Sequence, residues 1–511
     1  MKKTKKLLSV TLVIFTVWVL FLFASCGSNN GDKKTVTPDG SGTAPTSGNE
    51  AGGTSEGEVP EFAPTGDKYN AYNFKIIGFD SYEGGWRAMT YCETYAAEIN
   101  SDPINDALYN RNAKVEELYD IKITNVPLSY GDRDSHTRVA INHIMADPTA
   151  FDMGLMLVGS TTAIIRDNAN IAFDLFEVDG LDLTKSWWDK SSVEQLSIGG
   201  RLYYATGDIS LYNAFARSGF VFNKKILSDT GLENPYELVR SGKWTWDKLA
   251  EMARQATKDL DGDAVIDYRY DRMGLAIGHG SLGGTITSSG EMLAVKDADD
   301  YPVINNNQDK IVSIIDKIMP IMRDPTIACV AVDMTRYSNP CFEFIMPKFK
   351  DNELMFYQIS LLNALELRDM DADFGILPQP KYDEAQDWYY SGVNGGFQTM
   401  VWIPAGNEDI DRTAAVIEAM GYYGQQYVIP AFYETTITHK ALRDEDSLEM
   451  LDIIRESVIY DLGMLYGWGG YSGIFDTILS KKSFTNNFIS SYDKISEKIQ
   501  IDLDLTLEKL W

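Results

Sequence analysis

The chain has 511 residues, too many for one compact core, so its length predicts two or more lobes. Its apolar content of 44% and aromatic content of 12% indicate a globular body and exclude a fully disordered chain. The formal net charge of −28 argues against nucleic acid as a partner, because phosphate binding needs lysine and arginine to displace counterions.

The first 25 residues predict an export signal. Four lysines precede an apolar run at 7–23, and small residues follow it. The residues around Cys26, Ala-Ser-Cys-Gly, resemble a bacterial lipobox, although Phe23 stands where leucine is usual. This resemblance implies cleavage before Cys26 and attachment of a lipid (palmitate among its acyl chains). The alternative is an uncut transmembrane anchor, since the run is nearly long enough to span a bilayer. Either reading places the body outside the cytoplasm, at the outer face of the cell membrane.

Residues 26–66 predict a flexible linker. They are rich in Gly, Ser, Thr and Pro and contain almost no apolar side chains. Such a segment buries too little apolar surface to order itself. We therefore expect a tether between a membrane anchor and a folded body.

The first part of the body alternates strands and helices. Strands are expected at 74–79, 121–128 and 151–159, and helices with apolar residues at helical spacing are expected at 104–120 and 136–146. Apolar strands separated by helices predict a parallel sheet covered on both faces.

A second series of elements follows. Residues 201–207 and 218–227 predict strands leading into a helix, and 245–259 predict a helix with Thr245 as its N-cap and Asp247 in its first turn. The strands expected next lie at 353–360, 372–380 and 399–406. From about Asp411 the pattern is mainly helical.

The order of these pieces resembles the extracellular solute-binding proteins of bacterial ABC importers, the family 1 proteins that include maltose-binding protein. The resemblance is carried by the lipobox with its linker and by four stretches of the body, at 199–227, 231–263, 373–383 and 401–409. The most specific part is Gly-Lys-Trp-Thr-Trp-Asp at 242–247, followed by an acidic loop. The similarity covers nearly the whole body, from about Asp67 to Trp511.

This resemblance implies the fold and the division into domains. It implies an α/β protein of the periplasmic-binding-protein type II class, with two α/β lobes, a hinge and a ligand cleft between the lobes. Lobe 1 would comprise 67–205 and 372–435, and lobe 2 would comprise 206–371 and 436–511. It also implies a monomer that captures a carbohydrate, closes on it and docks on the transmembrane subunits of a permease.

Two tryptophans are candidate ligand platforms, because flat aromatic faces suit sugar rings. Trp468 lies in Tyr-Gly-Trp-Gly-Gly-Tyr, a run too rich in glycine for an ordinary helix core, and Trp86 lies in a Gly-Gly loop after the first strand. The resemblance implies that both stand at the cleft. The alternative for any aromatic residue is the core, and we expect Trp244 and Trp246 to pack there.

Four other residues are candidate cleft residues. Ser160 and Thr161 follow a strand at the edge where open α/β sheets bind ligands. Asp208 lies in a segment expected to cross between the lobes, and Tyr357 is implied by the resemblance.

The acidic loop at 259–271 is a candidate calcium site. Asp259, Asp261 and Asp263 occupy EF-hand positions 1, 3 and 5, the Val265 carbonyl falls at position 7 and Asp267 at position 9. Position 12 is tyrosine instead of the bidentate glutamate, so the pattern predicts structural calcium and not a calcium sensor. The alternative is a solvated acidic turn.

Signatures of an enzyme are weak. Residues 278–284 contain Gly-x-Gly-x-x-Gly but do not open a helix of an early βαβ unit, so we interpret them as a loop at the cleft. The four histidines lack zinc spacing. Three cysteines remain beyond the lipid site, Cys92, Cys329 and Cys341, an odd number that closes no disulfide framework. Buried free thiols are expected, and a Cys329–Cys341 bridge is the alternative.

The sequence thus predicts a lipid-anchored binding protein for a carbohydrate, expected to be an oligosaccharide, with no catalytic residue. Three alternatives stay open. One is a secreted glycoside hydrolase or lyase, which needs two carboxylates across the ligand. Another is a surface adhesin. The last is a peptide- or amino-acid-binding protein of the same fold, which would need a charged anchor such as Arg87 or Arg217.

Overall fold

The computed structural model describes residues 62–81, 90–213, 215–435, 445–480 and 485–510. Residues Glu61–Trp511 form one compact unit. The predicted signal, the lipid site Cys26 and nearly all of the predicted linker lie outside the described residues. None of the described helices is both long and apolar enough to cross a membrane.

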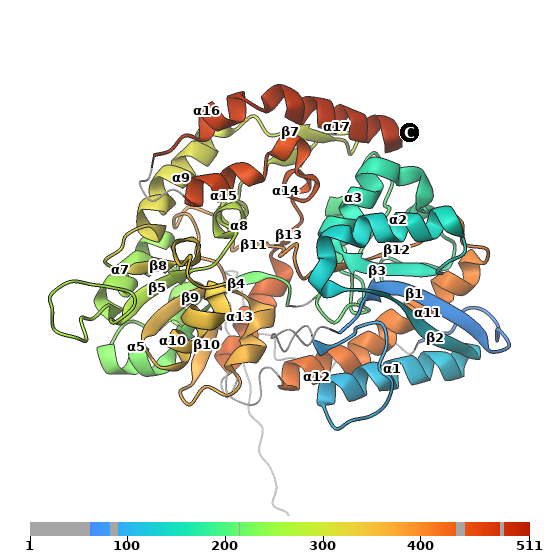
Figure 1. Cartoon of the computed structure of the whole chain (residues 1–511), viewed down its shortest axis with the longest axis horizontal. Coiled ribbons are helices and arrows are strands. Elements are labelled where there is room, and N and C mark those ends of the chain that lie inside the picture. The colour runs from blue at the N-terminus through green and yellow to red at the C-terminus, as the bar shows by residue number, and fades with distance from the viewer. Residues whose placement is uncertain (1–61, 82–89, 214, 436–444, 481–484, 511) are drawn as a thin grey trace, which may run out of the picture. The chain divides into compact units, whose positions relative to one another are not determined.

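The first sheet has the strand order β12-β3-β1-β2 (Figure 1). Strand β1 (Tyr72–Phe79) pairs in parallel with both β2 (Ile121–Leu128) and β3 (Met153–Leu157), and β12 (Thr399–Trp402) pairs antiparallel with β3. The parallel sheet predicted for this part of the chain is confirmed.

Helices connect the parallel strands of this sheet. Helix α1 (Pro103–Tyr119) begins with the Asp102 carboxylate accepting hydrogen bonds from the N–H groups of Ile104 and Asn105. Its buried face includes Leu108 and Val115, as the helical spacing predicts. Helix α2 (His136–Ala146) follows β2, and α3 (Val158–Asn168) follows β3.

The second sheet has the order β10-β4-β9-β5-β8. Strands β5 (Met273–Ile277), β8 (Ala328–Val330) and β9 (Leu354–Ser360) run in parallel. Strands β4 (Ser218–Asn223) and β10 (Phe374–Leu377) run antiparallel to their neighbours. Two short two-stranded pairs complete the strands, β6 (Ala294–Lys296) with β7 (Pro302–Ile304) and β11 (Ser391–Gly392) with β13 (Val458–Ile459).

Two details of the predicted division are wrong. Residue 372 was the expected return to lobe 1, yet β10 pairs with β4 in the second sheet. Gly375 permits this, because a Cβ there would lie only 2.2 Å from Phe222 and from the Tyr236 hydroxyl, which cover it. The chain rejoins the first sheet at β12.

The linker also ends earlier than residue 66, since the ring of Phe62 stacks on Tyr422 with centroids 5.1 Å apart. The other domain limits stay predictions.

Helix α7 (Trp246–Ala256) confirms the local signals read from the sequence. The Thr245 hydroxyl accepts from the N–H of Lys248 at 3.3 Å, as an N-cap does. Trp244 and Trp246 are fully buried, which confirms that they pack in the core. The other helices of this part of the chain are α5 (Lys224–Thr230) and α6 (Pro235–Arg240) before α7, and α8 (Ser281–Ser288), α9 (Gln308–Met322) and α10 (Met346–Lys350) after it.

The C-terminal part is mainly helical, as predicted. Helices α11 (Ile410–Tyr423) and α12 (Ile429–Tyr433) contact α1 of the first sheet, whereas α13 (Glu445–Glu456) contacts β10 of the second. Helix α16 lies against α15, α17 and α9 (Figure 1), and α14 and α17 also contact α3. The bounds of these last helices are α14 Leu462–Tyr466, α15 Gly473–Leu479, α16 Phe488–Asp493 and α17 Ser496–Leu510.

Candidate ligand-binding site

A cavity of 810 Å³ opens at the carboxyl end of the second sheet. Its walls come from the segments that follow β5, β8 and β9, because parallel strands bring their carboxyl ends to one edge. Residues 392–397, which lead from the second sheet to β12, form another wall, and residues near α14 and α15 complete it. Its volume lies within the range of small-molecule sites in proteins.

Several solved binding proteins share this fold. The Listeria monocytogenes substrate-binding protein Lmo0181, in complex with cycloalternan, aligns with a TM-score of 0.52 at 10% identity, over 86% of this chain and 99% of that one. The maltose/maltodextrin-binding domain of Bdellovibrio bacteriovorus bound to maltotriose aligns with a TM-score of 0.52 at 14% identity, over 85% and 100%. UgpB of Mycobacterium tuberculosis in complex with glycerophosphocholine aligns with a TM-score of 0.53 at 13% identity, over 86% and 100%.

The chain has the type II periplasmic-binding-protein fold. At these identities the likeness establishes the fold, and at that level the resemblance to family 1 solute-binding proteins read from the sequence is confirmed. No protein-family model matches the sequence, and no curated protein matches it.

Small polar residues are common in the described lining of the cavity, alongside apolar side chains. Glycine, serine, threonine and asparagine make up much of the lining, and among the described residues that line it none is lysine or arginine. The lining carboxylates are those of Asp461 and Asp476, and His279 is the lining imidazole. Four aromatic rings also contribute, those of Phe342, Tyr357, Phe397 and Phe475. Such a surface suits a neutral ligand that offers both hydroxyl groups and apolar faces.

Asp461 has a structural task despite its place in the wall. Its carboxylate accepts backbone hydrogen bonds from Leu293 (2.8 Å), Ala294 (3.3 Å) and Gly463 (2.9 Å). Burial raises the pKa of Asp461 to about 6, against the lowering effect of these bonds. Asp476 is different, because its side chain is exposed and makes no hydrogen bond among the described residues. Partial desolvation raises the pKa of Asp476, and the nearby His279 opposes this rise.

Residues 278–284 line the cavity, as expected, but only in part as a loop. Gly278, His279 and Gly280 connect β5 to α8, and Ser281, Gly283 and Gly284 belong to the first turn of that helix. Gly280 has φ 66°, a left-handed conformation that glycine adopts without strain. The segment therefore does open a helix, at the carboxyl edge of the second sheet.

Of the predicted ligand residues that the structure describes, Tyr357 alone lines the cavity. Tyr357 lies on β9 and is 2% exposed. Its hydroxyl forms a hydrogen bond with the thiol of Cys341. Burial, and then the neighbouring Cys341, raise the pKa of Tyr357 well above its ordinary value. Its ring edge can therefore contribute to the wall, while its hydroxyl is engaged within the protein.

Trp468 lies in the core and not in the cavity. It is 1% exposed, its ring stacks on Tyr466 at 5.0 Å, and its indole N–H donates to the Thr506 hydroxyl at 3.0 Å. Gly469 brings the segment against α17, because a Cβ there would lie 2.6 Å from the backbone nitrogen of Ile499. The glycines around Trp468 thus serve close packing.

Ser160 and Thr161 form the start of α3, at the carboxyl edge of the first sheet. The Thr161 hydroxyl is buried and donates to the carbonyl oxygens of Met156 (3.3 Å) and Leu157 (3.2 Å). Ser160 is half-buried. The structure brings neither residue to the cavity, and Trp86 lies outside the described residues.

Asp208 lies in the segment that links the two sheets. It accepts from the Gln425 side chain at 2.9 Å, and burial raises the pKa of Asp208 to about 7. It does not line the cavity. On either side of Asp208 in the chain, Ala205 forms an isolated antiparallel bridge with Val401 of β12, and Arg217 forms one with Val393.

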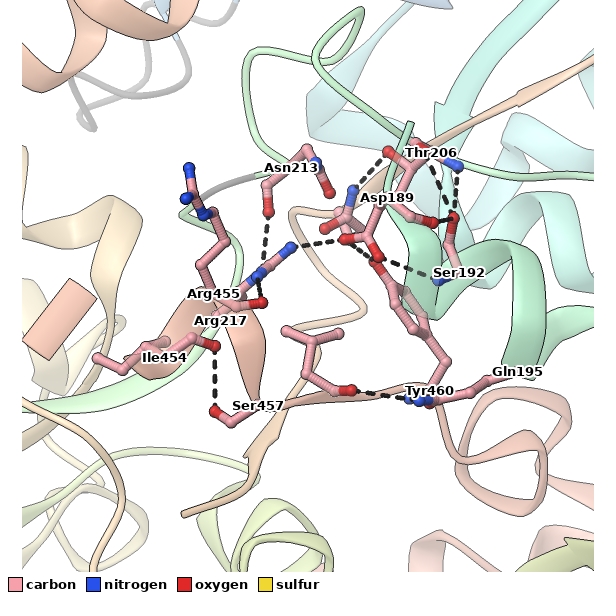
Figure 2. Close-up of polar contacts among 12 residues, drawn as sticks. Asp189, Ser192, Gln195, Thr206, Asn213, Arg217, Ile454, Arg455, Ser457 and Tyr460 are labelled. Carbon is pink, nitrogen blue, oxygen red and sulfur yellow. Dashed lines mark hydrogen bonds and ion pairs between the residues drawn. The ribbon is translucent and has the colours of Figure 1, made fainter. Parts of the chain in front are cut away.

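A buried ion pair between Arg217 and Asp189 lies at the segment that links the two sheets. The Arg217 guanidinium donates to the Asp189 carboxylate at 2.6 Å, and the two side chains are 1% and 7% exposed. Figure 2 shows that guanidinium also reaching the backbone carbonyl of Arg455 (2.7 Å), while the Tyr460 hydroxyl donates to Asp189 (3.1 Å). Arg217 is therefore engaged and does not line the cavity as a ligand anchor. Arg87 lies outside the described residues.

The acidic loop brings three of its five predicted ligand residues together. Carboxylate oxygens of Asp259, Asp261 and Asp263 lie within 4.8 Å of one another, which one calcium ion with ligands at about 2.4 Å can span. The Asp267 carboxylate instead pairs with the Arg269 guanidinium, which lowers the pKa of Asp267 to about 2. Val265 is exposed, as a loop residue that offers only its carbonyl would be.

The three cysteines are free thiols, as expected. Cys341 lines the cavity next to Tyr357, Cys329 is buried, and the Cys92 thiol lies 3.2 Å from the Thr94 hydroxyl.

Sequence reasoning did not find most of the polar lining. Asn339, Ser360, Asn394 and Asp476 follow strands or lie on a short helix, and nothing in their local sequence separates them from other loop residues. The one available signal was the position of Ser360 at the carboxyl end of a buried strand, the same rule that selected Ser160.

Proposed function

We propose that this protein is an extracellular solute-binding lipoprotein of an ABC importer that captures a carbohydrate in its cleft and delivers it to the permease. The cavity carries the proposal, because its 810 Å³ combine aromatic rings with hydroxyl and amide groups, and its described lining contains no lysine or arginine. Two of the aligned binding proteins hold an oligosaccharide, cycloalternan in one and maltotriose in the other. An oligosaccharide is therefore the favoured ligand.

Binding without catalysis is favoured by the carboxylates of the cavity. A glycosidase needs two carboxylates free to act as acid and as base or nucleophile. Among the described residues of the lining, Asp461 is held by three backbone N–H groups and only Asp476 is free of such bonds. This arrangement supports a ligand that leaves chemically unchanged.

A peptide or amino-acid ligand is less favoured. Its carboxylate would need a cationic partner. Arg217 is buried in its pair with Asp189, and lysine and arginine are absent from the described lining.

The proposal includes the membrane anchor inferred from the sequence, with Cys26 as the lipid site. Labelling cells with radioactive palmitate should mark the wild-type protein. Cys26→Ala should abolish the label and release the protein from the membrane fraction. A labelled Cys26→Ala variant would contradict this part of the proposal.

We propose further that Asp259, Asp261 and Asp263 hold a structural calcium ion. A bound cation would offset the repulsion among these carboxylates and hold the loop after α7. Chelation should lower the Tm and leave ligand specificity unchanged. If chelation abolishes ligand binding without lowering the Tm, this role is wrong.

The deciding experiment is a thermal-shift screen of the full-length protein in detergent against glycans and peptides. A glycan that raises the Tm and is recovered intact supports the proposal, because a ligand that binds only the native state stabilises it. Recovery of cleaved glycan would favour the hydrolase instead. Stabilisation by peptides alone would favour the peptide-binding alternative.

A further inference from the structure

The first turn of α8 faces the cavity with backbone donors that lack helical acceptors. The first N–H groups of any helix have no carbonyl partner within the helix. Helix α8 begins at Ser281 after Gly280, and no side chain caps it. Ser281, Gly283 and Gly284 all line the cavity, where Ser281 and Gly284 are half-buried and the Met464 side chain covers Gly283. This end of α8 therefore offers hydrogen-bond donors to whatever occupies the cavity.

A buried serine hydroxyl lies beside the same turn. Ser360 is 8% exposed, and its Oγ has no hydrogen-bond partner among the described residues. Leaving such a group unpaired costs free energy unless a ligand or water completes it.

The contact between β9 and α8 indicates where the Ser360 hydroxyl lies. Gln358, two residues earlier on β9, donates to the Thr285 hydroxyl of α8 at 3.4 Å, so this face of the strand is covered by α8. Since α8 follows β5, which is parallel to β9, the helix returns in the opposite direction. Two residues forward along β9 advance about 7 Å and four residues back along α8 about 6 Å, which sets Ser360 beside Ser281.

A carboxylate that can accept hydrogen bonds, that of Asp476, lines the same cavity. Asp476 belongs to α15, which packs on α8, and its carboxylate lies within electrostatic range of His279. With no lysine or arginine in the described lining, nothing there compensates the charge of Asp476 permanently. An anionic group placed beside Asp476 would be repelled.

We propose that the start of α8, Ser360 and Asp476 form one subsite for an uncharged, hydroxyl-bearing sugar residue and exclude sugar acids. The backbone N–H groups and the Ser360 hydroxyl donate to a sugar oxygen, and a sugar hydroxyl donates to Asp476. This subsite deepens the proposed function and rests on it.

The test uses matched pairs of oligosaccharides with the full-length protein in detergent. The probes are di- to tetrasaccharides of glucose, galactose and mannose, each compared with its counterpart that carries a C6 carboxylate. Calorimetric titration of the best neutral probe should give an affinity at least about tenfold higher than that of its acid. Equal or tighter binding of the acid would overturn the subsite. If no glycan binds at all, the proposed function itself fails and the subsite with it.

Asp476→Asn provides the sharper arm. It should weaken the neutral probe about fivefold and strengthen the acidic one, so that the ratio of the two affinities falls by about tenfold or more. Asp504→Asn, an exposed residue of α17 outside the cavity, changes the net charge equally and should leave the ratio unchanged. A ratio unchanged in Asp476→Asn, or changed equally in both variants, would overturn the role of Asp476.

Ser360→Ala separates ligand contact from a structural role. The substitution removes an unpaired buried hydroxyl, so the Tm of the free protein should stay equal or rise, while the affinity for the neutral probe falls about fivefold. A lower Tm with unchanged affinity would show that Ser360 serves the fold, and would overturn its place in the subsite.

Discussion

Two glycine-rich segments on the second-sheet side of the molecule have similar composition and opposite environments. Residues 466–473, the tryptophan segment, pack Trp468 into the core, whereas residues 278–284, the cavity segment, form a wall of the cavity. Gly469 (φ 63°) and Gly280 (φ 66°) share a left-handed backbone. A Cβ at Gly469 would meet the backbone of Ile499, whereas at Gly280 it would meet no described atom within 4 Å. Gly469 thus permits close packing, whereas Gly280 leaves space beside it.

The largest expected effect tests the burial of Trp468. Trp468→Ala should lower the free energy of unfolding by about 3–5 kcal/mol, because it empties a fully buried ring site and leaves the Thr506 hydroxyl without its indole donor. Ligand affinity at a temperature where the variant is folded should be unchanged. Urea unfolding and calorimetric titration measure the two quantities. If Trp468→Ala instead loses ligand affinity and changes the free energy of unfolding by less than about 1 kcal/mol, Trp468 binds the ligand and does not serve the core.

The next prediction compares two glycines with matched backbone conformation. Gly469→Ala should cost about 3 kcal/mol, the sum of left-handed strain and displacement of the Ile499 backbone. Gly280→Ala should cost only about 1 kcal/mol, since strain is its only cost. Urea unfolding of both variants gives the difference. Equal costs would mean that close packing does not distinguish the segments.

Asp461, which precedes the tryptophan segment, makes stability depend on pH. Its pKa of about 6 in the native state lies above the ordinary 3.8, so between these values the native state binds more protons than the unfolded state. Stability from this group is therefore present below pH 4 and decreases as the pH rises to 6, by on the order of 2 kcal/mol. Urea unfolding from pH 4 to 7 should show a smaller decrease in Asp461→Asn than in the wild type. If the pH dependence of the free energy of unfolding is the same in Asp461→Asn as in the wild type, a group other than Asp461 binds the proton.

The smallest expected effect on stability concerns the cavity segment. Gly284→Ala adds a methyl group in a helix, where its nearest contact would be the Ser218 hydroxyl at 3.8 Å. The free energy of unfolding should be unchanged or rise by up to about 1 kcal/mol. Affinity for the neutral oligosaccharide should fall, because the methyl group narrows the cavity. Unchanged affinity would show that the ligand does not reach this turn.

Local signals predicted the elements well, because their causes are local. The Thr245 cap, the apolar face of α7 and the β-branched strand β2 each depend on residues a few positions apart. The resemblance carried by the order of the elements and by motifs such as Gly-Lys-Trp-Thr-Trp-Asp implied the fold, and the aligned binding proteins confirm it. The limits of the domains were less secure, since an apolar strand such as β10 can complete either sheet.

The candidate site was predicted less well, for a physical reason. Thr161 and Ser360 both lie at the carboxyl edge of a buried strand, yet the Thr161 hydroxyl bonds to carbonyl groups of its own chain segment and the Ser360 hydroxyl has no described partner. The rule that ligands bind at the carboxyl ends of parallel strands selects both residues, because it takes no account of their hydrogen-bond partners.

The sequence by itself determined the composition, the local elements, the acidic loop and, through their order, the two-lobed α/β class. Only the tertiary structure decided that Trp468 is buried, that β10 joins the second sheet and that Ser360, Asp476 and the start of α8 share one cavity. These outcomes depend on contacts between segments distant in sequence, from Trp468 with Thr506, 38 residues apart, to the pairing of β10 with β4. A local pattern specifies a helix or a strand, but which surface remains open is fixed only when all neighbours are in place.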